Sequence, residues 1–183
     1  MNFFIQSLTY LRIIASPIIF LLVILGLYGW AFILTFLGAI SDFWDGYLAR
    51  RYNLESTIGS ILDPIADKIL LTFLILSLSL AMSSSFVSFV GGLMLIREFW
   101  VSALRDINAR ENNESATKVT FLAKIKTFIQ LTAFLMLIFG LHINNFLVIL
   151  LGKFFLFASL IITLQTGFGY TVKTFNSLKS RIK

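Results

Sequence analysis

Six long apolar segments make up most of this 183-residue chain, and they limit what it can fold into. A helix needs about 20 apolar residues to cross the hydrocarbon core of a bilayer. Hydrophobic residues make up 58% of the chain and charged residues only 13%, whereas a soluble domain carries about 25% charged residues. Because backbone polar groups must be hydrogen-bonded inside a membrane, we predict an all-α polytopic membrane protein with a single domain over 1–183. The predicted transmembrane helices are 9–27, 30–49, 58–80, 86–104, 119–140 and 146–167.

Lysine and arginine are unevenly distributed among the short connections between these spans. The first, third and fifth connections contain no Lys or Arg, whereas the second, the fourth and the tail are basic. Positive charge accumulates on the cytoplasmic side of membrane proteins. We therefore predict that both termini and the second and fourth connections are cytoplasmic. The five predicted connections are 28–29, 50–57, 81–85, 105–118 and 141–145.

The composition also narrows the chemistry. Cys is absent and His142 is the single histidine, so thiolate chemistry is excluded and histidine-based catalysis has little to build on. The net charge is +6. In so apolar a chain this charge favours anionic lipid headgroups and phosphorylated substrates as partners, and not nucleic acid. The basic tail at 173–183 is interpreted as a headgroup-binding segment.

Four of the nine acidic residues, all of them aspartates, lie inside two neighbouring segments that are otherwise apolar. An ionisable group at membrane depth is costly and indicates a functional site. Four carboxylates cannot neutralise one another, so a cation must lie among them. Hard oxygen ligands suit Mg²⁺, Mn²⁺ or Ca²⁺. The four residues are Asp42, Asp45, Asp63 and Asp67.

The spacing of these acids predicts one pocket between two helices. Asp42 and Asp45 share one helical face, and Asp63 and Asp67 share another. If the intervening turn centres near 53–54, antiparallel helices set Asp42 level with Asp67, and Asp45 level with Asp63. At 1.5 Å per residue the pocket lies about 15 Å from the turn. We therefore expect it just inside the cytoplasmic side.

Small residues accompany the acids on these faces. Gly46, Ala49 and Gly59 remove side-chain bulk, so that a flat ligand or a neighbouring helix can approach closely. Arg50 lies at the water-facing end and can donate two hydrogen bonds to a phosphate. Pro64 interrupts the backbone hydrogen bonds of its helix beside Asp63.

Two other interpretations of the acidic residues remain open. The acids could pair with Lys68, Arg50 and Arg51 and serve only to hold helices together. They could also line a pathway for divalent cations, which would make the protein a transporter. Neither interpretation explains why small residues alternate with the acids.

The arrangement D-x₂-D-G-x₂-A-R-x₈-G-x₃-D-x₃-D resembles the signature of the CDP-alcohol phosphatidyltransferase family. The resemblance implies a six-helix membrane enzyme, often a homodimer, that displaces CMP from a CDP-alcohol with a second alcohol. It also implies two divalent cations, Mg²⁺ or Mn²⁺. The residues that meet the signature are Asp42, Asp45, Gly46, Ala49, Arg50, Gly59, Asp63 and Asp67.

The resemblance assigns roles within this signature. The four aspartates are expected to bind the metal ions, and Asp67 is also expected to be the catalytic base. The segment Leu8-Thr9-x₂-Arg12 resembles an N-terminal box of the family, which commonly has Asn where this chain has Gln6. The residues expected to bind CDP-diacylglycerol are Thr9, Gly46, Ala49, Arg50 and Gly59.

Two further segments resemble the bacterial branch of the family that uses sn-glycerol 3-phosphate as the acceptor. They are 96–105, and Lys124-Ile125-Lys126-Thr127 followed by Gln130. Arg97 and Arg105 are eight residues apart and are expected to share a face. We therefore expect the acceptor phosphate to bind Arg97, Arg105, Lys124 and Lys126.

Alternatives to this acceptor site remain. Arg97 could pair with Glu98 or with an aspartate, and the other three cations could simply flank membrane spans. Within the family, the acceptor could instead be inositol phosphate or phosphatidylglycerol. The preferred interpretation places the enzyme in the cytoplasmic membrane of a bacterium, with its site on the cytoplasmic side.

Overall fold

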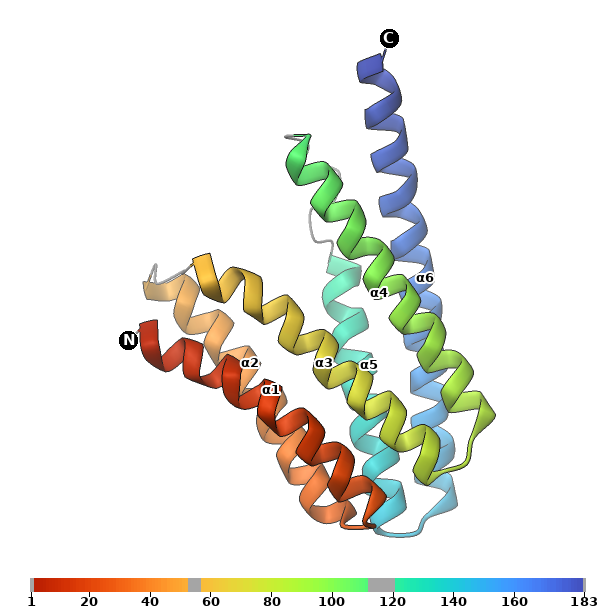
Figure 1. The fold of residues 1–183 in the computed structure, drawn as a ribbon. Coiled ribbons are helices and arrows are strands. Elements are labelled where there is room, and N and C mark those ends of the chain that lie inside the picture. Colours follow the sequence, from red (N-terminus) through yellow and green to blue (C-terminus); the bar gives the residue numbers. More distant parts are fainter. Residues whose placement is uncertain (1, 53–56, 112–120, 183) are drawn as a thin grey trace.

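A computed structural model describes residues 2–52, 57–111 and 121–182, and these residues form six helices (Figure 1). Within the helices, the side chains of 2–8, 42–52, 57–61, 123–124 and 180–182 lie outside the description. The predicted all-α class is confirmed, and each predicted span corresponds to one helix. The helices are α1 (Asn2–Ile24), α2 (Tyr28–Tyr52), α3 (Thr57–Ala81), α4 (Ser85–Arg110), α5 (Phe121–His142) and α6 (Phe146–Ile182).

Four helical stretches of the described residues are long and apolar enough to cross a membrane. They are Leu62–Ala81, Ser85–Arg110, Ile125–His142 and Phe146–Lys179. In α1 and α2 the described apolar stretches are shorter, Thr9–Ile24 and Tyr28–Ser41. These lengths support a multi-pass membrane protein, and the crossing of α1 and α2 stays a prediction.

Two predicted boundaries were wrong. The first connection lies at 25–27 and not at 28–29, because Gly26 adopts a φ of +75° that ends α1. The amide of Leu27 then donates to the carbonyl of Leu22 at 2.8 Å, which closes the helix end. The last helix does not stop at residue 167. It continues to Ile182, so the described part of the basic tail is helical.

The bundle has two different ends. Figure 1 shows the connections at 25–27, 82–84 and 143–145 at one end and both termini at the other. α1 packs against α2 and α3, α4 packs against α3 and α6, and α5 packs against α2 and α6. Near the short connections the described core contains no buried charged residue, and its buried apolar residues include Val23, Leu78, Val87, Leu137 and Leu156.

The approach of α4 to α3 depends on a glycine in this apolar half. A Cβ atom added to Gly91 would lie 2.4 Å from Cγ2 of the buried Ile75. The two helices therefore pack with almost no space between them. Toward the termini the same helices carry the polar residues that form the site.

The orientation of the bundle can be tested by labelling single cysteines, because the chain contains none of its own. Glu111 and Ile143 are exposed at opposite ends. We expect a membrane-impermeant maleimide on intact cells to label Ile143→Cys and to leave Glu111→Cys unlabelled, since the basic end is predicted to be cytoplasmic. Both should be labelled after permeabilisation. Labelling of Glu111→Cys in intact cells would show that the orientation is inverted.

Candidate functional site

A cavity of about 340 Å³ lies within the bundle and is lined by five of the six helices. It collects both kinds of charged residue that the sequence analysis selected. Asp63 and Asp67 reach it from α3, and Arg105 and Lys126 reach it from α4 and α5. The other polar or small lining residues are Arg12, Gly38, Ala39, Lys68, Glu98, Ser102, Thr127 and Gln130.

Helix α1 holds the two described carboxylates of the signature. Thr9 Oγ1 donates to Asp63 Oδ1 at 2.6 Å, and Arg12 Nη1 donates to Asp67 Oδ1 at 2.7 Å. The Arg12 side chain is only 1% exposed, whereas that of Asp67 is 57% exposed. A buried guanidinium thus orients a carboxylate that still faces open space. The contact from Thr9 places this residue beside the acidic group, and its expected role in binding CDP-diacylglycerol stays a prediction.

The described part of the site offers two carboxylates to a hard divalent cation, and no group of three or more acidic or histidine ligands gathers among the described residues. Asp63 and Asp67 bring carboxylate oxygens to one cavity, and such oxygens are the ligands that Mg²⁺ and Mn²⁺ prefer. The expected level pairing of the four acids stays a prediction. The signature side chains outside the description are Asp42, Asp45, Gly46, Ala49, Arg50 and Gly59.

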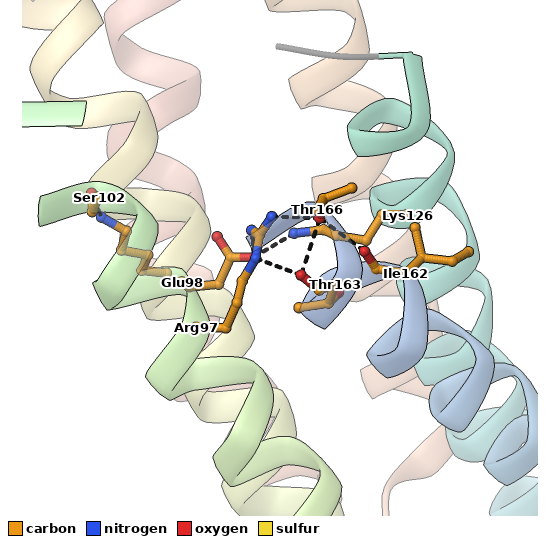
Figure 2. A network of polar contacts seen from close by, with 8 residues as sticks. Arg97, Glu98, Ser102, Lys126, Ile162, Thr163 and Thr166 are labelled. Atoms are coloured by element: carbon orange, nitrogen blue, oxygen red, sulfur yellow. Dashed lines mark hydrogen bonds and ion pairs between the residues drawn. The ribbon is translucent and has the colours of Figure 1, made fainter. Parts of the chain in front are cut away.

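The basic part of the site is organised by Glu98 (Figure 2). Its Oε1 atom accepts a hydrogen bond from Arg97 Nη1 at 3.0 Å and another from Lys126 Nζ. Arg97 continues to α6, where Nε donates to the Thr163 carbonyl at 2.9 Å and Nη2 donates to Thr166 Oγ1 at 2.7 Å. Three helices are therefore joined through one carboxylate and one guanidinium.

The predicted acceptor residues do not all lie in the same place. Arg105 and Lys126 line the cavity. Arg97 is buried between α4 and α6, where it is paired with Glu98, as the alternative interpretation proposed. The side chain of Lys124 lies outside the description. The structure thus brings Arg105 and Lys126 to the cavity and places Arg97 behind it.

The reason for the position of Arg97 is visible in the spacing of α4. Eight residues turn a helix through two turns and roughly 80° more, so Arg97 and Arg105 do not share a face. Glu98 and Arg105 are seven apart, which is within about 20° of two full turns. The face that includes Glu98, Ser102 and Arg105 lines the cavity.

Sequence analysis placed Arg12 in a family box without giving it a contact, named Glu98 only as a possible partner of Arg97, and assigned no role to Ser102. It considered Lys68 only as a partner for the acids. Instead, Lys68 Nζ donates to Ser102 Oγ at 2.5 Å and lies 6.0 Å from the centre of the Phe99 ring. The seven-residue spacing between Glu98 and Arg105 was the sequence signal that could have predicted that Glu98 lies on the cavity face of α4. Nothing in the local sequence indicates the contact between Arg12 and α3.

The family model that matches this chain and the relatives that resemble it point to the same protein family. The sequence model of the CDP-alcohol phosphatidyltransferase family matches residues 6–165. The chain is 39% identical over 136 residues to the CDP-diacylglycerol–glycerol-3-phosphate 3-phosphatidyltransferase of Rickettsia bellii (strain RML369-C), covering 73% of this chain and 72% of that protein. It is 36% identical over 131 residues to the protein of the same name from Salmonella choleraesuis (strain SC-B67), covering 69% and 71%.

The contacts of Arg97 predict a stability effect. Arg97→Ala should lower the free energy of unfolding by about 1.5–3 kcal/mol, because it removes the charged hydrogen bonds that link α4 to Thr163 and Thr166 of α6 and leaves Lys126 as the remaining partner of Glu98. Arg110→Ala is the matched control. Its guanidinium pairs with Asp106 on the same helix, and both side chains are exposed, so removing it should cost at most about 1 kcal/mol. Unfolding midpoints in detergent measure both, and equal midpoints would contradict the structural role of Arg97.

Proposed function

The chain belongs to the CDP-alcohol phosphatidyltransferase family, and from this premise we propose that it makes phosphatidylglycerophosphate. The donor is CDP-diacylglycerol, the acceptor is sn-glycerol 3-phosphate, and the second product is CMP. Relatives from Rickettsia and Salmonella carry the name of this reaction. The observation that carries the proposal is a single cavity that contains the carboxylates of Asp63 and Asp67 together with the cations Arg105 and Lys126.

Members of this family generally depend on divalent cations. We propose two such ions, Mg²⁺ or Mn²⁺, bound by Asp42, Asp45, Asp63 and Asp67. When bound, they would neutralise the pyrophosphate of the donor and polarise the phosphorus under attack. Thr9 and Arg12 support this role because they fix the carboxylates of α3 from the neighbouring helix. The residues proposed for the cytidine diphosphate part of the donor are Thr9, Gly46, Ala49, Arg50 and Gly59.

The acceptor phosphate is assigned to Arg105 and Lys126, together with Lys124, which lies two residues earlier on α5. Charged hydrogen bonds of this kind bind a phosphate dianion more tightly than a neutral alcohol. Arg97 lies behind the cavity and supports the acceptor site indirectly, because it holds Glu98 and anchors α4 to α6. This assignment changes the role expected for Arg97 from binding the ligand to supporting the residues that bind it.

The proposed reaction is a displacement at the phosphatidyl phosphorus. A terminal hydroxyl oxygen of glycerol 3-phosphate forms the new bond to phosphorus, and the bond from phosphorus to the oxygen of CMP breaks. CMP leaves with the bonding electron pair. The hydroxyl proton passes to the carboxylate of Asp67, which Arg12 orients by its hydrogen bond at 2.7 Å.

The membrane setting follows from the two substrates. The acyl chains of the donor stay in lipid, whereas the acceptor arrives from water, so the cavity must lie near a membrane surface. We propose the cytoplasmic surface of a bacterial cell membrane, with both termini on that side. The protein is proposed to act as a homodimer. The exposed cations near the end of α6, such as Lys173 and Lys179, are proposed to contact anionic lipid headgroups.

The metal site is tested by Asp63→Asn. This change removes one charged ligand and should reduce CMP release to background, since the remaining carboxylates cannot balance two dications. Asp106→Asn is the control, because Asp106 is an exposed residue that pairs with Arg110. CMP release is measured with purified protein, CDP-diacylglycerol, glycerol 3-phosphate and Mg²⁺ or Mn²⁺. Activity of Asp63→Asn within a few-fold of the unchanged protein would refute the metal assignment.

The acceptor site is tested by Lys126→Ala. A charged hydrogen bond contributes about 1.5–3 kcal/mol, so the KM for glycerol 3-phosphate should rise roughly 10- to 100-fold. The KM for CDP-diacylglycerol should stay nearly unchanged. Lys153→Ala is the control, since Lys153 lies near the short connections at the other end of α6. A rise in the donor KM instead would assign Lys126 to the nucleotide. Inositol phosphate and phosphatidylglycerol, assayed in parallel, test the choice of acceptor.

A further inference from the structure

Glu98 is an acidic residue in a part of the cavity that is otherwise suited to an anion. It lines the cavity together with Arg105 and Lys126. A carboxylate at this position repels a phosphate, so its presence needs an explanation beyond the binding of the acceptor phosphate. The pairing with Lys126 and Arg97 accounts for the role of only one carboxylate oxygen, because both hydrogen bonds are accepted by Oε1.

The second oxygen of Glu98 has a different environment. No described residue donates a hydrogen bond to Oε2, and the side chain is 22% exposed. In Figure 2 one carboxylate oxygen of Glu98 points away from the dashed contacts. Oε2 is therefore a free acceptor atom on a residue that lines the cavity, and the two hydrogen bonds to Oε1 restrict its direction.

The local charge balance still allows an anion to bind next to this oxygen. Lys68, Arg105 and Lys126 line this side of the cavity together with the single carboxylate of Glu98, so positive charges outnumber negative ones there. A phosphate is drawn toward Arg105 and Lys126 and repelled by Oε2. A hydroxyl group, in contrast, donates well to a carboxylate oxygen. The two cations and the Oε2 atom together can orient a molecule that carries a phosphate and a hydroxyl group a few atoms apart.

We propose that Glu98 is a specificity-determining residue for the acceptor, and that its Oε2 atom accepts a hydrogen bond from the secondary hydroxyl of glycerol 3-phosphate. This inference rests on the proposed function. The terminal hydroxyl stays available to attack the donor, while the phosphate and the secondary hydroxyl fix the orientation of the molecule. A site built around such a hydrogen bond discriminates against an analogue that lacks the hydroxyl group.

The test compares two acceptors on the full-length protein. One is sn-glycerol 3-phosphate, and the other is 1,3-propanediol monophosphate, which keeps the phosphate and a terminal hydroxyl but lacks the secondary one. The unchanged protein should favour glycerol 3-phosphate by roughly 10- to 100-fold in kcat/KM, the worth of one charged hydrogen bond. In Glu98→Gln this preference should fall to within about threefold of unity, because the amide binds the hydroxyl group much more weakly.

Two further variants separate this role from a structural one. Glu98→Asp keeps the negative charge but withdraws the carboxylate by one methylene, so it should lose part of the preference even if Glu98→Gln fails to fold. Asp106→Asn, on the same helix but exposed and away from the cavity lining, should keep the full preference. The KM for CDP-diacylglycerol, measured for each variant, reports whether the rest of the site is intact.

The outcomes are distinguishable. If Glu98→Gln and Glu98→Asp slow both acceptors equally and leave the ratio unchanged, Glu98 only holds Lys126 and the inference is overturned. An unchanged protein that uses the two acceptors equally well would also overturn it. If glycerol 3-phosphate does not support CMP release from the unchanged protein, the proposed function itself fails, and the acceptor on which the inference depends is lost.

Discussion

The pairing of charges inside an apolar bundle is the constraint on which the rest of this structure depends. A charged side chain away from water must find a partner of opposite charge or a set of hydrogen bonds. Glu98 meets this requirement for Lys126 on α5 and for Arg97 on its own helix, and Arg97 carries the connection on to α6. One carboxylate and one guanidinium therefore link α4 to α5, which lines the cavity, and to α6, which lies behind it.

The same constraint operates on the acidic side, where α1 supplies the partners. Thr9 and Arg12 reach the carboxylates of Asp63 and Asp67 on α3. The guanidinium of Arg12 is buried, so its pairing with Asp67 lies in a part of the bundle away from water. The packing of α1 against α3 therefore helps to orient Asp67.

The two ends of the bundle have separate tasks. Close packing near the short connections, where Gly91 lets α4 approach Ile75, holds the helices without any charged residue in the apolar core. Toward the termini the bundle instead surrounds a cavity of about 340 Å³. A lipid-linked donor and a water-soluble acceptor can meet only near the membrane surface, so an open polar end on a rigid apolar base suits the proposed reaction.

The sequence by itself determined the helices and the residue types of the site, and only the tertiary structure decided which side chains meet. Hydropathy and helical periodicity are local properties, so six helices and the face shared by Asp63 and Asp67 could be predicted from them. The partner of a long polar side chain depends on how helices far apart in sequence pack together. For this reason the contact of Arg12 with Asp67, 55 residues away, could not be predicted. Arg97 turned toward α6, 66 residues further on, and Glu98 took the place at the cavity that the sequence had suggested for Arg97.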